Sequence, residues 1–169
     1  SECHKHGRRY ARKGKGEIMS TRSRIAVVES PSKVLSIYCH SDGYIEGNGI
    51  CLQEYYNSQE KALEIIKQND CSYLSSTIEE SRFYNTWRGE ETRALRFHNI
   101  EDCLNHAFPK EGFNGIEYLY IWMGTQWMVK AGYFLGVSSG QPIGRHTLIK
   151  LEDAISFEEN RHEREESEV

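Results

Sequence analysis

The stretch that decides the fold is Arg24–His40, which reads RIAVVESPSKVLSIYCH. Its two halves, Arg24–Glu29 and Val34–His40, are rich in β-branched residues, as β-strands are. Between them lies Ser30–Lys33, a cluster of residues that form turns. The pattern predicts a β-hairpin that ends near His40.

A second hairpin is predicted further along the chain. Segments 117–123 and 126–134 are rich in aromatic and β-branched residues, and they flank the dipeptide Gly124-Thr125. A two-residue loop that begins with Gly fits a type II′ turn. Aromatic residues alternate along 118–122, which predicts one strand face packed against helices.

Helices are predicted between the two hairpins. Gly47–Gly49 is expected to interrupt the chain before a helical stretch over 50–56. Either Asn57 or Ser58 is placed to cap the next helix, and Asn99 to cap another, because their side-chain oxygens accept hydrogen bonds from backbone amides. Together these patterns predict an α+β fold: a single domain with a mainly antiparallel sheet built from hairpins and two to three helices packed on it.

The two ends of the chain differ in composition from the middle. Residues 1–18 are basic with few apolar side chains, and Lys15–Met19 can be encoded by a ribosome-binding sequence followed by a start codon. We therefore expect 1–18 to be a disordered leader outside the native product, with a basic arm that binds nucleic acid as the alternative. Residues 19–156 are expected to form the α+β domain, and 157–169 an acidic tail, either disordered or a frayed helix.

Composition narrows the function classes. The net charge is −4, and without the basic leader the remainder is more acidic, which makes nucleic acid an improbable partner for the core domain. The five cysteines are odd in number and irregularly spaced, as in proteins of a reducing cytosol. No apolar run approaches the ~20 residues of a membrane span. We expect a protein of the host bacterial cytoplasm with no membrane association.

His40 and Asp42 form the first candidate pair for chemistry. On an extended strand their side chains share one face, and a carboxylate can orient an imidazole for base catalysis or metal binding. The alternative is a turn at Asp42-Gly43, with Asp42 capping backbone amides. We favour the turn, because no nucleophile or third ligand lies nearby in sequence. An enzyme would need His98 or Glu101 to complete the site.

A second candidate is the pair Cys103 and His106, which has the spacing of metal ligands on a helix. Cys39-His40 could complete such a site, but zinc sites more often show two Cys-x-x-Cys-type pairs. Cys103 falls on the apolar stripe of its helix, so we interpret it as a small core residue. We predict neither a metal nor a cofactor.

The segment Tyr84–Glu90 is the strongest candidate for a ligand or a partner. Trp87 and Arg88 stand beside each other, and together such residues stack on a base, grip a phosphate or anchor a protein interface. The alternative is a loop in which Arg88 pairs with Glu90 or Glu91 and Trp87 covers the edge of the core. The two interpretations are balanced.

The motifs resemble a family of small proteins from tailed phages and bacterial mobile elements. The resemblance begins at Met19–Ile25 and Ser36–Tyr44, and it extends to about Leu151. Further matching motifs are Leu52-x-Glu54-x-Tyr56, Arg88-Gly89-Glu90 and the aromatic hairpin Tyr118–Val129. Family members often have Trp in place of Ser41 and Pro in place of Ile45. If that Trp helps to form a binding face in the family, the face of this protein is altered. The resemblance implies a phage origin and carries no catalytic assignment.

We therefore expect a phage-encoded accessory protein that binds a host protein or a small nucleotide-like ligand without catalysis. The first alternative is a small metal-dependent hydrolase or nuclease that uses His40 and Asp42. The second is nucleic-acid binding through the basic leader. The expected binding residues are His40, Asp42, Tyr44, Trp87, Arg88 and Glu90.

Overall fold

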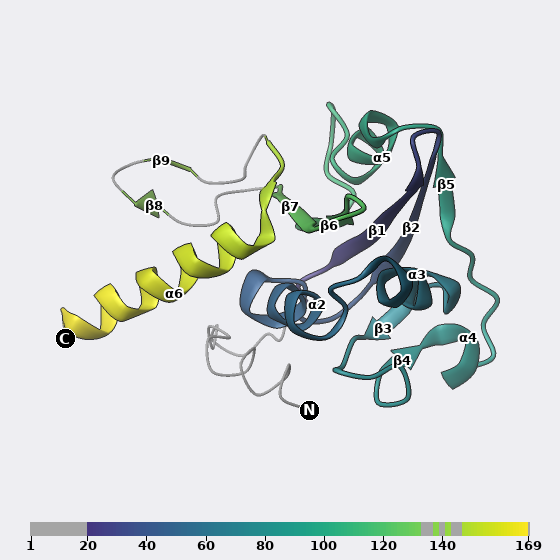
Figure 1. Cartoon of the computed structure of the whole chain (residues 1–169), viewed down its shortest axis with the longest axis horizontal. Helices are drawn as coiled ribbons and strands as arrows, with labels where there is room; N and C mark the ends of the chain where they lie inside the picture. Colours follow the sequence, from purple (N-terminus) through teal and green to yellow (C-terminus); the bar gives the residue numbers. More distant parts are fainter. Residues whose placement is uncertain (1–19, 133–136, 139–140, 143–146, 169) are drawn as a thin grey trace.

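A computed structural model describes residues 20–132, 137–138, 141–142 and 147–168. The predicted leader, 1–18, therefore lies outside the described residues. Figure 1 shows one large β-sheet with helices on both sides and a long helix, α6, that runs away from it. The fold is α+β, as predicted.

The sheet has eight strands in the order β10-β7-β6-β1-β2-β3-β4, with β5 paired to β2. The strands are β1 (Ser23–Ser30), β2 (Lys33–Cys39), β3 (Cys71–Tyr73), β4 (Arg82–Phe83), β5 (Leu95–Phe97), β6 (Tyr118–Trp122), β7 (Trp127–Ala131) and β10 (Ile149–Lys150). A separate two-stranded sheet pairs β8 (Val137–Ser138) with β9 (Gln141–Pro142).

Both predicted hairpins are present. β1 pairs antiparallel with β2, and β6 pairs antiparallel with β7. Gly124 in the second turn has a positive φ of 96°, a conformation that Gly adopts without steric cost.

The sheet is mainly antiparallel, but the prediction that hairpins alone build it is wrong. β1 pairs in parallel with β6, and β2 pairs in parallel with β3. Parallel neighbours need a long connection between them, so sequence patterns that detect hairpins do not reveal these pairs.

Helices in the described residues outnumber the predicted two to three. They are η1 (Ile45–Gly49, a π-helix), α2 (Ile50–Tyr55), α3 (Gln59–Lys67), α4 (Tyr84–Trp87), α5 (Ile100–Ala107) and α6 (Leu151–Ser167). Of the two candidates, Ser58 and not Asn57 caps α3 through its side-chain oxygen, and Asn99 caps α5 as predicted. The expected interruption at Gly47–Gly49 is wrong, because these residues are part of the buried π-helix η1.

Two apolar cores lie on opposite faces of the sheet. Alternate residues of β1 face opposite ways: Ile25 and Val27 pack with α2, α3 and α6, whereas Ala26 packs with α5. β6 is buried along its whole length because it has helices on both faces. The aromatic row Tyr118, Tyr120 and Trp122 lies in the first core, so the predicted burial against helices is confirmed.

The acidic segment after residue 156 continues α6 as far as Ser167. Its side chains include Arg161, which forms ion pairs with Glu158 and Glu165 one turn away on either side. Such i,i+3 and i,i+4 pairs support a helix that buries little apolar surface.

Candidate functional site

The segment Ser36–Tyr44 ends β2 and leads into η1. After Cys39, two more backbone amides donate hydrogen bonds to β3. The His40 amide donates to Cys71 O at 2.9 Å, and the Ser41 amide donates to Ser72 O at 3.0 Å. Asp42 then adopts a positive φ of 56°. The strand therefore turns at Asp42.

Close backbone approach explains the glycine in this motif. The Gly43 amide donates to Thr21 O at 2.8 Å, and a Cβ on Gly43 would lie 2.7 Å from the same oxygen. The Tyr120 hydroxyl donates to Gly43 O at 2.6 Å, which ties the turn to β6. These contacts give Asp42-Gly43 a role in forming the turn.

His40 and Asp42 have different hydrogen-bond partners. His40 Nδ1 shares a hydrogen bond of 2.7 Å with the Tyr38 hydroxyl, whereas Asp42 Oδ1 accepts one of 3.4 Å from Tyr44. The side chains of His40 and Asp42 would share one face only if the backbone were extended at both residues. Asp42 has a left-handed backbone conformation, so this arrangement is not present.

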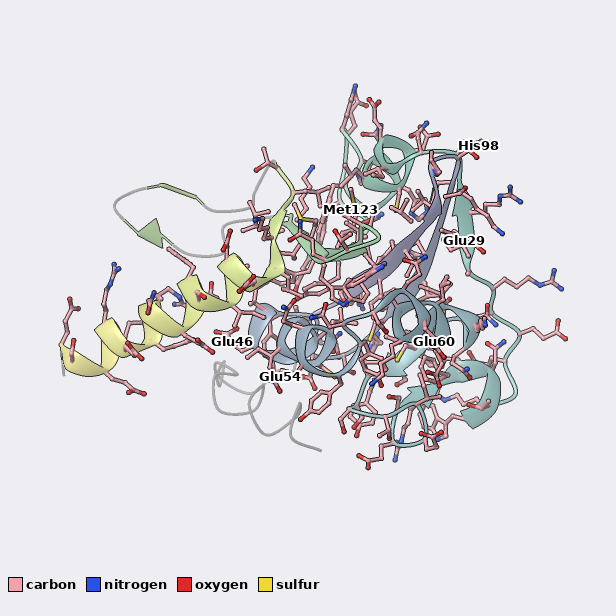
Figure 2. The ribbon with its side chains drawn as sticks, in the orientation of Figure 1. Glu29, Glu46, Glu54, Glu60, His98 and Met123 are labelled. Atoms are coloured by element: carbon pink, nitrogen blue, oxygen red, sulfur yellow. The ribbon has the colours of Figure 1, made fainter. Side chains whose placement is uncertain are left out.

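His98 and Glu101 lie at the other end of β2 from His40. Phe97 pairs with Val34, six residues before His40, so at ~3.3 Å per residue the separation is about 20 Å. Figure 2 shows His98 at the end of the sheet where the first hairpin turns. The structure therefore does not bring together the residues that the enzyme alternative requires.

Trp87 and Arg88 form an exposed stack at the end of α4. Trp87 is 44% exposed, and the Arg88 guanidinium lies 4.2 Å from the centre of its ring, with Arg82 at 5.1 Å. Arg88 also lies 5.7 Å from the Tyr84 ring and 3.7 Å from a Glu90 carboxylate oxygen. The pairing of Arg88 with Glu90 is present, and Trp87 is nevertheless open to solvent.

Asp70 connects this stack to the His40 end of β2. Its side chain accepts from the Tyr38 amide at 2.9 Å, and its carbonyl accepts from the Tyr84 amide at 3.1 Å. Burial raises the pKa of the Tyr38 hydroxyl, so it stays protonated at neutral pH.

We define the aromatic–arginine surface by the residues that these contacts join. They are Arg82, Tyr84, Trp87 and Arg88, which ring and cation–π contacts join. Through Asp70 this surface is linked to Tyr38, which shares a hydrogen bond with His40. Two predicted binding residues, Trp87 and Arg88, thus belong to one surface, and Glu90 borders it through its contact with Arg88. Asp42 and Tyr44 lie in the turn that leads from β2 to η1.

Sequence reasoning missed a buried polar cluster between η1 and α6. Glu46 and Glu158 are only 7% and 3% exposed, and His162 Nε2 lies 2.7 Å from Glu46 Oε1. Burial raises the pKa of Glu158 to about 7, an effect that nearby Glu46 reinforces and Arg161 opposes. The sequence signal that could have indicated the cluster is the i,i+4 spacing of Glu158 and His162. Both residues lie in the segment that was predicted as a tail.

The cysteines of the described residues are buried and reduced. Cys39, Cys51, Cys71 and Cys103 are free thiols. Burial raises the pKa of Cys103 to about 11, so the thiolate that a metal or an electrophile requires is scarce at neutral pH. Cys103 lies in the α5-side core, and its interpretation as a core residue is confirmed.

Comparison of the chain with family models, with curated proteins and with solved structures gives no match. Among the described residues, no helix combines the length and the apolar character needed to cross a membrane.

Proposed function

We propose that the protein is a phage-encoded accessory protein that binds a nucleotide-like ligand on the aromatic–arginine surface without catalysing a reaction. The phage origin comes from the resemblance of its N-terminal motifs. The observation that carries the ligand class is the exposed Trp87 ring with the guanidinium groups of Arg88 and Arg82 near it.

Each part of this surface suits one part of a nucleotide. An exposed indole offers a flat face on which a base stacks, and such stacking contributes ~1–3 kcal/mol per base. Arg82 and Arg88 supply planar, permanently charged donors for a phosphate. In this proposal the phosphate takes the place of the Glu90 carboxylate beside Arg88, because that ion pair is half exposed and weak.

His40 and Tyr38 provide hydrogen bonds at the edge of the surface. Because His40 Nδ1 is already engaged by Tyr38, the imidazole is oriented, with Nε2 as the ring nitrogen left to meet a ligand. Asp42 and Tyr44 support the turn behind it. Binding is favoured over hydrolysis because the acid candidates lie about 20 Å away along β2.

Intrinsic tryptophan fluorescence tests the proposal directly. Trp122 and Trp127 are buried and Trp87 is not, so a ligand that stacks on the surface quenches mainly Trp87. We expect saturable quenching by AMP and ATP in a chelating buffer, and none by inorganic phosphate alone. Arg88→Gln should weaken binding about tenfold, or ~1.4 kcal/mol, whereas Arg164→Gln on exposed α6 should leave it unchanged. Quenching that persists unchanged in Arg88→Gln would contradict the proposal.

A host protein is the second candidate for the same surface. Exposed Trp, Tyr and Arg side chains are the residues that most often dominate protein interfaces. If nucleotides fail to quench Trp87, a photo-crosslinking residue at position 87 should capture one defined host protein in infected cells. The matched control is the same residue at Phe113, which is 69% exposed. Capture at both positions alike would argue against a specific partner.

Binding of nucleic acid through residues 1–18 stays a prediction, because those residues lie outside the described part of the chain. It predicts retention on single-stranded DNA that falls steeply with salt and disappears when 1–18 are deleted. A nucleotide effect confined to Trp87 would not share that dependence on the leader.

A further inference from the structure

The cluster of Glu46, Glu158 and His162 joins two elements that are far apart in the sequence. Glu46 is the second residue of η1, and the other two lie one turn apart on α6. Figure 2 shows Glu46 beside the ribbon of α6. The three residues therefore approach one point from both sides of a single helix–helix contact.

The geometry of the cluster fits a small cation. One ligand atom from each residue lies within 4.8 Å of the other two. Two ligands at ~2.1 Å from a tetrahedral ion are about 3.4 Å apart, so the His162–Glu46 contact of 2.7 Å needs to widen by less than 1 Å. The i,i+4 spacing of Glu158 and His162 places both on one face of the helix, as in helical metal-ligand pairs.

The charges around the cluster favour a divalent ion. Glu46 and Glu158 are buried, and Glu165 lies within 4.0 Å of both Arg161 and His162. Among these side chains, three carboxyl groups thus face one guanidinium. Burying carboxylates without cations is costly, and a bound dication removes that cost.

The outer contacts resemble the support that protein metal sites receive. Arg161 donates through Nε and Nη2 to one oxygen of Glu158, at 3.0 Å and 2.8 Å, which fixes that carboxylate. Glu158 also shares a side-chain hydrogen bond with Glu46, so an ion between these two residues would take the place of that contact. His162 presents Nε2 to Glu46 and Nδ1 to Glu165, at 3.8 Å. A carboxylate behind a ligating histidine orients the ring and makes it a better ligand.

The backbone that presents Glu46 is itself unusual. A π-helix is rare and often marks a functional site, and all five residues of η1 are buried. Gly47 allows this conformation, because a Cβ there would lie 2.4 Å from Asp42 O. The turn at Asp42-Gly43 thus leads directly to the backbone that carries Glu46.

We propose that Glu46, Glu158 and His162 bind one divalent transition-metal ion, of which Zn²⁺ and Mn²⁺ are the representatives to test, and that this ion fastens α6 to η1. One imidazole and two carboxylates suit such ions better than Mg²⁺ or Ca²⁺, which prefer oxygen alone. The site is separate from the aromatic–arginine surface and does not depend on its function.

The test is calorimetric titration of the full chain with Zn²⁺, Mn²⁺ and Mg²⁺. Because Cys3, His4 and His6 could bind metal adventitiously, the protein should carry Cys3→Ser, His4→Gln and His6→Gln. We expect one Zn²⁺ or Mn²⁺ per chain, bound more tightly than Mg²⁺. At about 100 times the Kd, the ion should raise Tm by roughly 5–10 °C.

Substitutions decide whether the ion occupies this cluster. Glu46→Gln and His162→Gln should each weaken binding by roughly 100-fold, whereas Glu159→Gln, on the exposed side of α6, should leave it unchanged. Absence of saturable binding, or binding that survives both ligand substitutions, would overturn the proposal. If Glu46→Gln does not fold, the visible spectrum of the Co²⁺-loaded protein still reports whether an imidazole binds the ion, by comparison with His162→Gln. Nucleotide quenching measured in chelator is unaffected by this outcome, so the two proposals can fail independently.

Discussion

Two arginines, Arg88 and Arg161, form ion pairs that differ in their exposure to solvent. Arg88 lies at the solvent boundary over Trp87, 3.7 Å from a half-exposed Glu90. Arg161 is mostly covered and donates two hydrogen bonds to Glu158, which is almost fully buried. Water screens the first pair and weakens it, whereas the second must neutralise a carboxylate that water cannot reach. The exposed pair therefore contributes little to stability, and the buried pair helps to hold the fold.

The largest expected effect comes from Gly47→Ala in the buried region. The new Cβ would meet Asp42 O at 2.4 Å, so the backbone of η1 must shift, at a cost of about 3 kcal/mol in the free energy of unfolding. Urea denaturation measures the loss. Gly49→Ala is the control, because its Cβ would stand 3.3 Å or more from its neighbours, and a cost near ~1 kcal/mol is expected. Equal costs would show that close packing at η1 is not special.

Arg161→Met and Arg88→Met compare the two regions directly. Removing Arg161 leaves the Glu158 carboxylate buried without its cation, and we expect a loss of about 2 kcal/mol at pH 8 in chelator, reduced from the full buried-pair value by partial exposure of Arg161. Arg88→Met should change stability by less than about 0.5 kcal/mol. Matched urea titrations of both variants give the difference. Similar losses would mean that burial does not separate the regions.

The pH dependence of stability isolates Glu158. Its pKa in the folded protein is about 7 instead of the usual 4.5, so between these values the folded chain keeps a proton that the unfolded chain has lost. The free energy of unfolding therefore falls as pH rises from 4.5 to 7 and levels off above 7. Other groups around this carboxyl are Glu46, Arg161, His162 and Glu165.

We expect the chelator-treated wild type to lose about 1–2 kcal/mol over this interval relative to Glu158→Gln, a figure reduced for solvent screening. Thermal unfolding from pH 4.5 to 8 checks it. Parallel curves for the two proteins would assign the slope to other groups.

The smallest effect on stability is expected for Trp87→Ala. The side chain is 44% exposed, so its removal should cost less than about 0.5 kcal/mol, while the proposed nucleotide quenching should vanish. Trp122→Phe provides the contrast. The Trp122 ring is buried, and its Nε1 donates a hydrogen bond of 2.6 Å to Gln59 Oε1, so this substitution should lower Tm without changing ligand affinity. A large destabilisation by Trp87→Ala would make this residue part of the core.

Local signals in the sequence predicted much of the fold. The helix starts at Asn57 or Ser58 and at Asn99 could be predicted because a cap needs only a side-chain oxygen next to a helix start. The Gly124-Thr125 turn could be predicted because two residues define it. The parallel pairing of β1 with β6 has no such signature, since nothing at Ile25 indicates Tyr120 as its neighbour.

The candidate site shows the same limit. Trp87 and Arg88 are adjacent in sequence, so their stack could be predicted, but the link to His40 runs through Asp70 and required the structure. Glu46 and His162 are 116 positions apart. Their contact depends on the packing of α6 against η1. From composition alone, the part of α6 after residue 156 was expected to be a disordered tail or a frayed helix.

The parallel pairing of β1 with β6 also has a consequence for synthesis. β2 follows β1 directly in the chain, but the other edge of β1 pairs with β6, which is synthesised roughly 5–20 s later at ribosomal speed. During that interval the nascent chain exposes an apolar, unpaired strand edge, the feature that recruits foreign strands. Slow translation between β2 and β6 should therefore increase aggregation, and ribosome-associated chaperones should protect this stage of folding.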